Sequence, residues 1–325
     1  MKMGKLNLKD FDDVIKNYMG IKKKSTLLSS SIGEDSCIID IKLIKEDFIL
    51  ISSDPITFTS KDIGKLSIII NSNDIYATGG NGYGIILTIL IPENKTMEDF
   101  RSLMEEINKE CIEHDLEILG GHTEVTNIVN DIVVSVTIIG VADKKDIVRT
   151  STSKKGDLIF LTKTLGIEGT ILLFDEVKDK LSCNYDEDIE KFKTYLSIKD
   201  ESRILKNFNI TSMHDITEGG LIGALLEMSY ASKNGFRIVN ENIEIHKLTR
   251  ELCSILNKDV LRIVSSGNLI FTSNKMYKND ILDAFYDKGI ECSVIGEVID
   301  DGDYFINYNG IDNRILANIE DSYLF

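Results

Sequence analysis

Residues 62–80 read DIGKLSIIINSNDIYATGG, and this stretch decides how the first half of the chain is expected to fold. Its apolar residues recur at the spacing of a helix: Ile63, Leu66, Ile69, Ile70 and Ile75. Asp62 can cap the first turn, and two glycines at 79 and 80 can end the last one. The stretch therefore predicts a buried helix over residues 62–79.

A polar pair, Asn73-Asp74, interrupts this apolar helix. A carboxylate buried there costs several kcal/mol unless it is paired or bound to a metal ion. The alternative is that this face of the helix is turned to solvent. Three further carboxylates, Asp35, Asp54 and Glu124, stand beside small or β-type residues at the ends of apolar runs. Taken alone, acids in such places are often turn formers.

Taken together, the four carboxylates predict a metal site. Carboxylates that converge without basic partners repel one another, so they need a divalent cation. Oxygen ligands favour Mg²⁺, which binds through a few carboxylates together with the phosphates of a substrate. We therefore expect a Mg-nucleotide site formed by Asp35, Asp54, Asp74 and Glu124.

Outward from the first helix, the pattern predicts two domains, residues 1–148 and 149–325. The first has a β-β-α-β-α-β-β order, with a weak helical pattern at 9–19 before it. Its strands are expected at 36–41, 48–52, 85–91, 116–119 and 132–141, and its second helix at 96–114. The polar stretch 149–156 marks the boundary. Beyond it we expect a strand at 157–162, helices near 168–176 and 187–205, a turn and helix over 215–232, and a strand near 303–307.

Two glycine-rich segments are candidate ligand loops. Gly120-Gly121-His122-Thr123-Glu124 follows a strand, and its glycines allow close approach of a ligand; the alternative is a plain tight turn. His122 has no second ligand nearby, so it does not indicate zinc. Asp215-Ile216-Thr217-Glu218-Gly219-Gly220 opens a helix, where free N–H groups can bind an anion. The alternative is an ordinary helix cap by Asp215 or Thr217.

Composition narrows the class of protein. The chain has 325 residues and a net charge of −16, which argues against nucleic acid or an anionic membrane as partner. Five scattered cysteines without a Cys-x-x-Cys pair fit reduced thiols. The N-terminus lacks the apolar core of a signal peptide, and the longest apolar run, 83–92, is about half of the roughly 20 residues of a membrane helix. We therefore expect a cytoplasmic protein.

Six motifs in order resemble the aminoimidazole ribonucleotide (AIR) synthase superfamily, also called PurM-like, which includes HypE, thiamine-monophosphate kinase and selenophosphate synthetase. The likeness covers nearly the whole chain and is nearest to HypE-related AIR synthases, which share Gly4-Lys5-Leu6. The six motifs are residues 33–39, 53–54, 62–66, 73–75, 120–124 and 215–221. The resemblance implies an α+β, two-domain fold whose N-terminal domain dimerises through its sheet.

The resemblance also implies an ATP site between the domains and across the dimer interface. Mg²⁺ would be held by Asp35, Asp54, Asp74 and Glu124, and the catalytic residues would be Lys65, which neutralises phosphate charge, and Asp215. The nucleotide would further be bound by a larger set: Asp35, Asp54, Asn73, Asp74, Gly120, Gly121, His122, Thr123, Thr217, Glu218, Gly219 and Gly220. A homodimer is also expected because the strand at 85–91 is apolar on both sides, Ile85, Leu87 and Ile89 alternating with Ile86, Thr88 and Leu90.

The chain departs from HypE in two places. It ends in residues 321–325 without the acceptor cysteine of HypE, and Ser265-Ser266-Gly267 replaces an Asn-Glu-Gly stretch that carries an acid. The early Cys-and-Lys loop of selenophosphate synthetase is also missing. The implied function is an ATP-dependent enzyme that phosphorylates an amide- or carboxyl-type group on a small molecule or a protein. The alternatives are a small-molecule kinase of the thiamine-monophosphate kinase type and a non-catalytic nucleotide-binding maturation partner.

Overall fold

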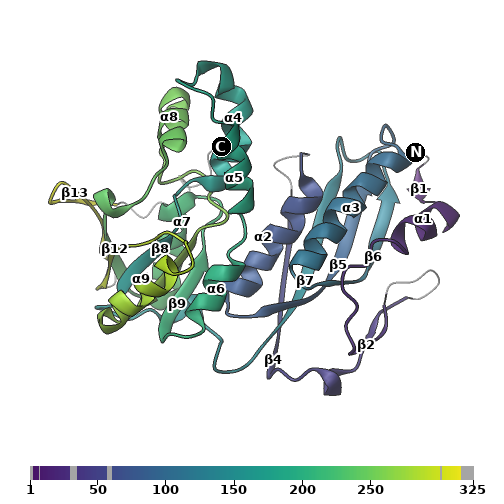
Figure 1. The fold of residues 1–325 in the computed structure, drawn as a ribbon, viewed down its shortest axis with the longest axis horizontal. Helices are drawn as coiled ribbons and strands as arrows, with labels where there is room; N and C mark the ends of the chain where they lie inside the picture. The colour runs from purple at the N-terminus through teal and green to yellow at the C-terminus, as the bar shows by residue number, and fades with distance from the viewer. Residues whose placement is uncertain (1–2, 7, 30–34, 57–60, 301, 316–325) are drawn as a thin grey trace. The chain divides into compact units, whose positions relative to one another are not determined.

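A computed structural model describes the chain apart from residues 1–2, 7, 30–34, 57–60, 301 and 316–325 (Figure 1). The predicted motif residues 33–34 and the C-terminal residues 321–325 therefore lie outside the described part. The chain forms two compact units. The first unit comprises residues 1–76 and 80–146, and the second comprises residues 77–79 and 147–325.

A mixed sheet with the strand order β1-β6-β5-β7-β4 forms the centre of the first unit. Strands β5 and β6 run parallel, and the other neighbouring pairs are antiparallel. The bounds of these strands are β1 Gly4–Lys5, β4 Phe48–Ile56, β5 Asn81–Ile91, β6 Glu117–Val125 and β7 Val133–Ala142. A small separate sheet pairs β2 (Thr26–Leu28) with β3 (Ile38–Ile39). The predicted β-β-α-β-α-β-β order is confirmed from β3 to β7, whereas β1 and β2 were not predicted.

Helices α2 (Ile63–Ala77) and α3 (Met97–Glu113) cover one face of this sheet, and α1 (Leu8–Ile15) lies beside α3 (Figure 1). Helix α3 is amphipathic as expected, with Phe100 and Ile107 fully buried. The central part of α2 is buried on nearly every side, because Ile68, Asn71 and Asn73 are all inaccessible to solvent. Burial of the polar residues of α2 requires partners inside the unit.

The two faces of strand β5 have different roles. Ile85, Leu87 and Ile89 belong to the core beneath the helices, so the prediction that they contribute to an apolar outer side is wrong. Ile86 lies on the outer face and is 37% exposed. Part of that face is covered by the segment around β2 and β3, but large apolar side chains remain exposed on β4 and its surroundings: Leu27, Ile38, Ile41, Leu43, Phe48, Ile49 and Ile51.

A second, larger sheet organises the second unit, with the order β14-β13-β10-β12-β8-β11-β9. Its strands are β8 Leu158–Thr162, β9 Ile210–Asp215, β10 Gly235–Val239, β11 Leu269–Ser273, β12 Cys292–Ile299, β13 Tyr304–Tyr308 and β14 Ile311–Arg314. The helices are α4 Ile167–Val177, α5 Asp186–Thr194, α6 Lys199–Leu205, α7 Gly220–Ser232, α8 Lys247–Leu256 and α9 Lys278–Tyr286. No helix in the described part combines the length and apolar character needed to cross a bilayer.

Two predicted elements differ from the observed ones. The single helix expected at 187–205 is two helices, α5 and α6, because the backbone carbonyls of Tyr195 and Ser197 between them accept hydrogen bonds from the Lys163 ammonium. The segment Gly120–Glu124, predicted as a loop after a strand, continues strand β6 itself. Its position in a central strand fixes which side each of its residues faces.

Candidate functional site

The first candidate site lies where edge strand β4 meets helix α2. Residues 52 and 54 of β4 lie on the same face as the buried core, because Asp54 pairs with the buried Val136. The Ser52 hydroxyl donates a hydrogen bond to Asp74 Oδ2 at 2.6 Å. Asp74 is only half-buried, so it is neither fully immersed in the core nor on a face turned wholly to solvent. Two predicted carboxylates, Asp54 and Asp74, thus share one side of the sheet.

Asn71 holds the backbone at this site. Its Oδ1 accepts a hydrogen bond from Asp54 N at 3.0 Å, and its Nδ2 donates to Asp54 O at 3.3 Å and to Ser67 O at 2.9 Å. The buried amide is therefore satisfied and locks β4 to α2 next to the Asp54 side chain. Sequence reasoning missed Asn71, although its place three residues before Asp74 on a helix was a usable signal.

Lys65 lies near the acidic side of α3. Burial raises the pKa of the Glu110 carboxyl, and the positive charge of Lys65 opposes that rise. Burial also raises the pKa of Glu106, which accepts hydrogen bonds from the backbone N–H groups of Gly64 and Lys65. Glu106 thus takes up free N–H groups at the start of α2, a role that the sequence assigned to Asp62.

His122 and Glu124 face the other side of the sheet. Glu124 pairs with the outward-facing Leu90, and His122 Nε2 lies 3.2 Å from Glu124 Oε2. Gly121 lies in the inward-facing row at a φ of 152°, and a Cβ there would lie 2.1 Å from the Leu87 carbonyl oxygen. Only glycine fits at this position.

The predicted magnesium ligands therefore do not meet within one copy of the chain. Asp54 and Asp74 share the helix side of the sheet, Glu124 faces away from them, and Asp35 is exposed. Among the residues that the structure describes, no three His, Cys, Asp or Glu side chains are grouped closely enough to hold a metal ion.

The second candidate site is the segment Asp215–Gly220, here called the glycine loop, which joins β9 to α7. Gly219 and Gly220 both have positive φ, 80° and 61°, and Gly219 is the residue before the helix, with no side-chain cap. The alternative of a cap by Asp215 or Thr217 is therefore wrong. Gly220 N donates to Thr217 O at 3.1 Å, so part of the helix start is already used. Asp215 is buried and Glu218 is exposed.

A third acid, missed at the level of sequence, belongs to the same neighbourhood. Glu168 near the start of α4 is 5% exposed and accepts a hydrogen bond from Ser266 N at 3.3 Å. Burial raises the pKa of its carboxyl, and the charges of Glu218 and Asp215 raise it further. Ser266, in the stretch Ser265-Ser266-Gly267, thus lies against a carboxyl from elsewhere in the chain. The segment 166–169, Gly-Ile-Glu-Gly, was the available signal.

Comparisons with known proteins agree with this architecture. Residues 33–142 match the N-terminal domain, and residues 154–309 the C-terminal domain, of AIR synthase related proteins. A putative hydrogenase expression/formation protein of Methanocaldococcus jannaschii is 29% identical over 221 residues, 68% of this chain. That match spans 65% of the relative, which is just under two thirds of its length. A thiamine-monophosphate kinase of Buchnera aphidicola is 26% identical over 89% of this chain and 90% of its own.

Solved structures share the fold over the same range. HypE of E. coli superposes with a TM-score of 0.83 at 17% identity, covering 96% of this chain and 97% of that one. A HypE structure in complex with ATP gives 0.75 at 18% identity and covers 97% of this chain and 93% of that one. With both domain matches in order along the sequence and the two-unit α+β architecture in common, the chain belongs to the AIR synthase related family.

Proposed function

We propose that this protein is an ATP-dependent enzyme that transfers a phosphoryl group from Mg-ATP to an amide- or carboxyl-type oxygen of a small-molecule or protein-borne substrate. The observation that carries the proposal is the pair Asp54 and Asp74 on one side of the sheet, with the Asp54 backbone held by Asn71 and the Asp74 carboxylate held by Ser52. Support comes from relatives solved with nucleotide: HypE in complex with ATP, and a ThiL protein with AMPPCP.

The residues present fit magnesium. Asp54 and Asp74 offer oxygen donors only, which is the ligand type that Mg²⁺ prefers. Ser52 donates a hydrogen bond to the Asp74 carboxylate, and Asn71 holds the backbone of Asp54; such supports commonly matter about 10- to 100-fold for metal affinity. When bound, the ion neutralises charge on the phosphates. Asp35 and Glu124 remain proposed ligands, and Glu124 would join them only if a second copy of the chain completes the site.

A homodimer is therefore part of the proposal. The outer face that carries His122 and Glu124 also carries Ile86, and apolar side chains of β4 such as Ile51, which is 69% exposed, lie near it in the same unit. An apolar surface of this kind on a sheet is typical of an interface. Across such an interface, Gly120 and His122 would contact the nucleotide of the partner, whereas Thr123, which pairs with the core residue Ile89, lies on the helix side of the sheet.

The remaining residues have roles in binding and positioning. Lys65, whose positive charge acts on Glu110 in this structure, would instead neutralise charge on the phosphates. The glycine loop would face the phosphates or the acceptor, with Asp215 as the buried acid closest to the turn. The chemistry needs little covalent participation by the protein, since phosphoryl transfer is accelerated mainly by positioning and charge neutralisation.

A second candidate function is a small-molecule kinase of the thiamine-monophosphate kinase type. Its specific support is the Buchnera relative, which matches over 90% of its own length, more than the Methanocaldococcus protein does. A non-catalytic maturation partner is the third candidate, in keeping with a solved complex of HypE with HypF. Steady ADP formation with a phosphorylated metabolite favours the kinase, and nucleotide binding without turnover favours the partner.

Calorimetry with Mg-ATP tests the proposal first. We expect saturable binding that requires Mg²⁺, and a stabilisation of about 2.7 kcal/mol when ATP is present at roughly 100 times its Kd. Assays for ADP, AMP and phosphate then separate the candidate reactions. Absence of ATP binding in the presence of Mg²⁺ would remove the main proposal.

A further inference from the structure

The glycine loop rests on a buried stretch of backbone, residues 261–268, here called the supporting segment. Ile216 N donates to Asn268 O at 3.1 Å, and Ile222 N at the start of α7 donates to Leu261 O at 3.1 Å. The start of the loop and the first turn of α7 behind it are thus hydrogen-bonded to the two ends of the supporting segment. The position of the supporting segment therefore determines the position of the glycine loop.

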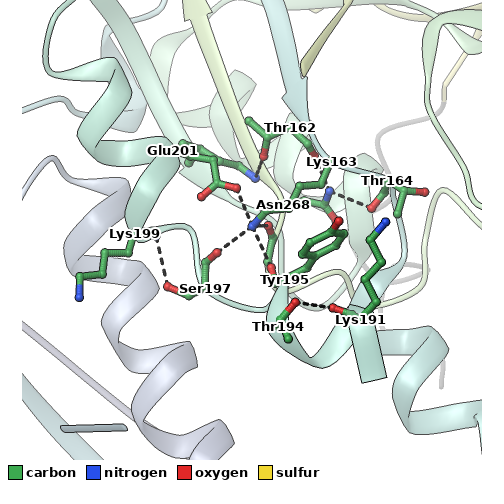
Figure 2. A network of polar contacts seen from close by, with 12 residues as sticks. Thr162, Lys163, Thr164, Lys191, Thr194, Tyr195, Ser197, Lys199, Glu201 and Asn268 are labelled. Atoms are coloured by element: carbon green, nitrogen blue, oxygen red, sulfur yellow. Dashed lines mark hydrogen bonds and ion pairs between the residues drawn. The ribbon is translucent and has the colours of Figure 1, made fainter. Parts of the chain in front are cut away.

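A single buried ammonium group anchors the supporting segment (Figure 2). Lys163 Nζ donates to the carbonyl oxygens of Tyr195 at 2.8 Å, Ser197 at 2.7 Å and Gly267 at 3.1 Å. The carboxylate of Glu201 lies 2.5 Å from the same nitrogen. An ammonium group has three protons, so the three carbonyl oxygens and the carboxylate together offer one acceptor more than it can fill.

The side chain of Asn268 strengthens the anchor. Its Nδ2 donates to Thr162 O at 2.5 Å and to Thr164 O at 3.0 Å, on either side of Lys163 in the chain. Its Oδ1 accepts a hydrogen bond from Ser265 Oγ at 2.6 Å. The end of strand β8 and the turn 265–268 therefore form one hydrogen-bonded unit.

Stability alone does not account for this arrangement. Lys163 is 8% exposed and Glu201 is 1% exposed, and burial lowers the pKa of the lysine and raises that of the glutamate. Taking two charges out of water costs about as much as their attraction returns, and apolar residues of similar volume often serve the fold equally well. The Lys163 ammonium, paired with the Glu201 carboxylate, donates to three carbonyl oxygens in fixed directions, and this gives an orientation that apolar side chains do not.

We propose that Lys163 and Glu201 are positioning residues for the glycine loop. Through Gly267 they hold the supporting segment, and through that segment they fix the backbone from Ile216 to Ile222. The inference rests on the proposed function in one respect: the loop so held is the one that would face the phosphates or the acceptor. Neither residue is required to touch the substrate.

The test is a double substitution, K163M/E201M, which removes both charges without leaving one of them buried alone. Hydrogen–deuterium exchange followed by mass spectrometry is measured on the intact protein without nucleotide. We expect peptides covering 214–223 to exchange about five- to tenfold faster, the factor expected from the loss of one net hydrogen bond, while peptides of β10 stay unchanged. The melting temperature shows that the fold is retained.

Lys191→Met is the matched control. Its ammonium lies 5.5 Å from the centre of the Tyr195 ring, close to the 5.8 Å of Lys163, but Lys191 is exposed. We expect exchange in 214–223 to match the wild type in this variant. Equal acceleration in the control and the double variant would overturn the proposal, as would unchanged exchange in a folded double variant.

Two further measurements complete the test. If the double variant does not fold, Glu201→Gln keeps the volume and removes the counter-charge of Lys163, and faster exchange confined to 214–223 is again expected; uniform exchange would overturn the proposal. Where ATP turnover is measurable, ADP formation should fall more in K163M/E201M than Mg-ATP affinity does. Because exchange is measured without nucleotide, a protein that fails to bind ATP refutes the proposed function and leaves this result standing on its own.

Discussion

Asp74→Asn separates metal binding from folding at the junction of β4 and α2. The substitution keeps the size of the side chain and removes the charge that the proposed Mg²⁺ site needs. In the wild type the Ser52 hydroxyl donates to Asp74 Oδ2 at 2.6 Å, and the amide oxygen of the variant can still accept this hydrogen bond. A charge-assisted hydrogen bond thus becomes a neutral one.

The magnitudes follow from that contact. Exchanging a charged acceptor for a neutral one at a half-buried site should lower the free energy of unfolding by about 1 kcal/mol. In a unit of this size that corresponds to a melting temperature lower by about 2–4 °C. Loss of a carboxylate ligand should weaken Mg-dependent ATP binding by at least tenfold, because changes even in the supports of metal ligands commonly cost about 10- to 100-fold.

Calorimetry with ATP, with and without Mg²⁺, provides the measurement, and urea denaturation provides the stability. Asp47→Asn is the control, since this exposed carboxylate accepts a hydrogen bond from Lys144 N at 2.8 Å next to the same strand. It should show a comparable change in stability and unchanged affinity. A folded Asp74→Asn protein that binds Mg-ATP within twofold of the wild type would refute the assignment of Asp74 to the metal.

Three further outcomes are expected. The pKa of the Glu168 carboxyl is higher in the folded protein than in the unfolded chain. The wild type should therefore lose stability as the pH rises from the unfolded pKa through the folded one. Urea titrations from pH 4 to pH 8 should show this loss in the wild type and not in Glu168→Gln. Gly121→Ala should cost about 2 kcal/mol or more in urea denaturation, whereas Gly120→Ala, with open space around its Cβ, should be nearly neutral; equal costs would contradict the assigned strand geometry. The protein should be a homodimer by light scattering at micromolar concentration, and Ile51→Lys should yield one chain mass; a monomeric wild type would contradict the proposed shared site.

Local patterns in the sequence were sufficient where a single element decides the outcome. The apolar stripe of 96–114 became α3, and its start is stabilised by a capping box between Thr96 and Asp99. The helix at 62–79 and the order of strands and helices along the chain from β3 to β7 also follow from periodicity and turn residues. The family could be identified from the sequence because several short motifs occur in the family's order, and such an order does not arise by chance.

Only the tertiary structure decided which residues share a side. Alternation shows that β5 has two apolar faces, but the register with β7 and β6 determines that Ile85 enters the core and that Glu124 faces away from Asp54. The break of the predicted helix at 187–205 was equally hidden, because it depends on Lys163, which lies 32 residues before Tyr195 in the chain.

The same reason applies to the buried polar groups. Local signals point to Asn71 and Glu168 as residues of interest but do not show that they are buried, and Glu201 has no such signal. The burial of all three depends on partners distant in sequence. Residue order determined the elements, the family and the acids with which to build a site. Long-range pairing determined which of those acids meet, because the cost of burying a charge is settled only by the partner that packing brings to it.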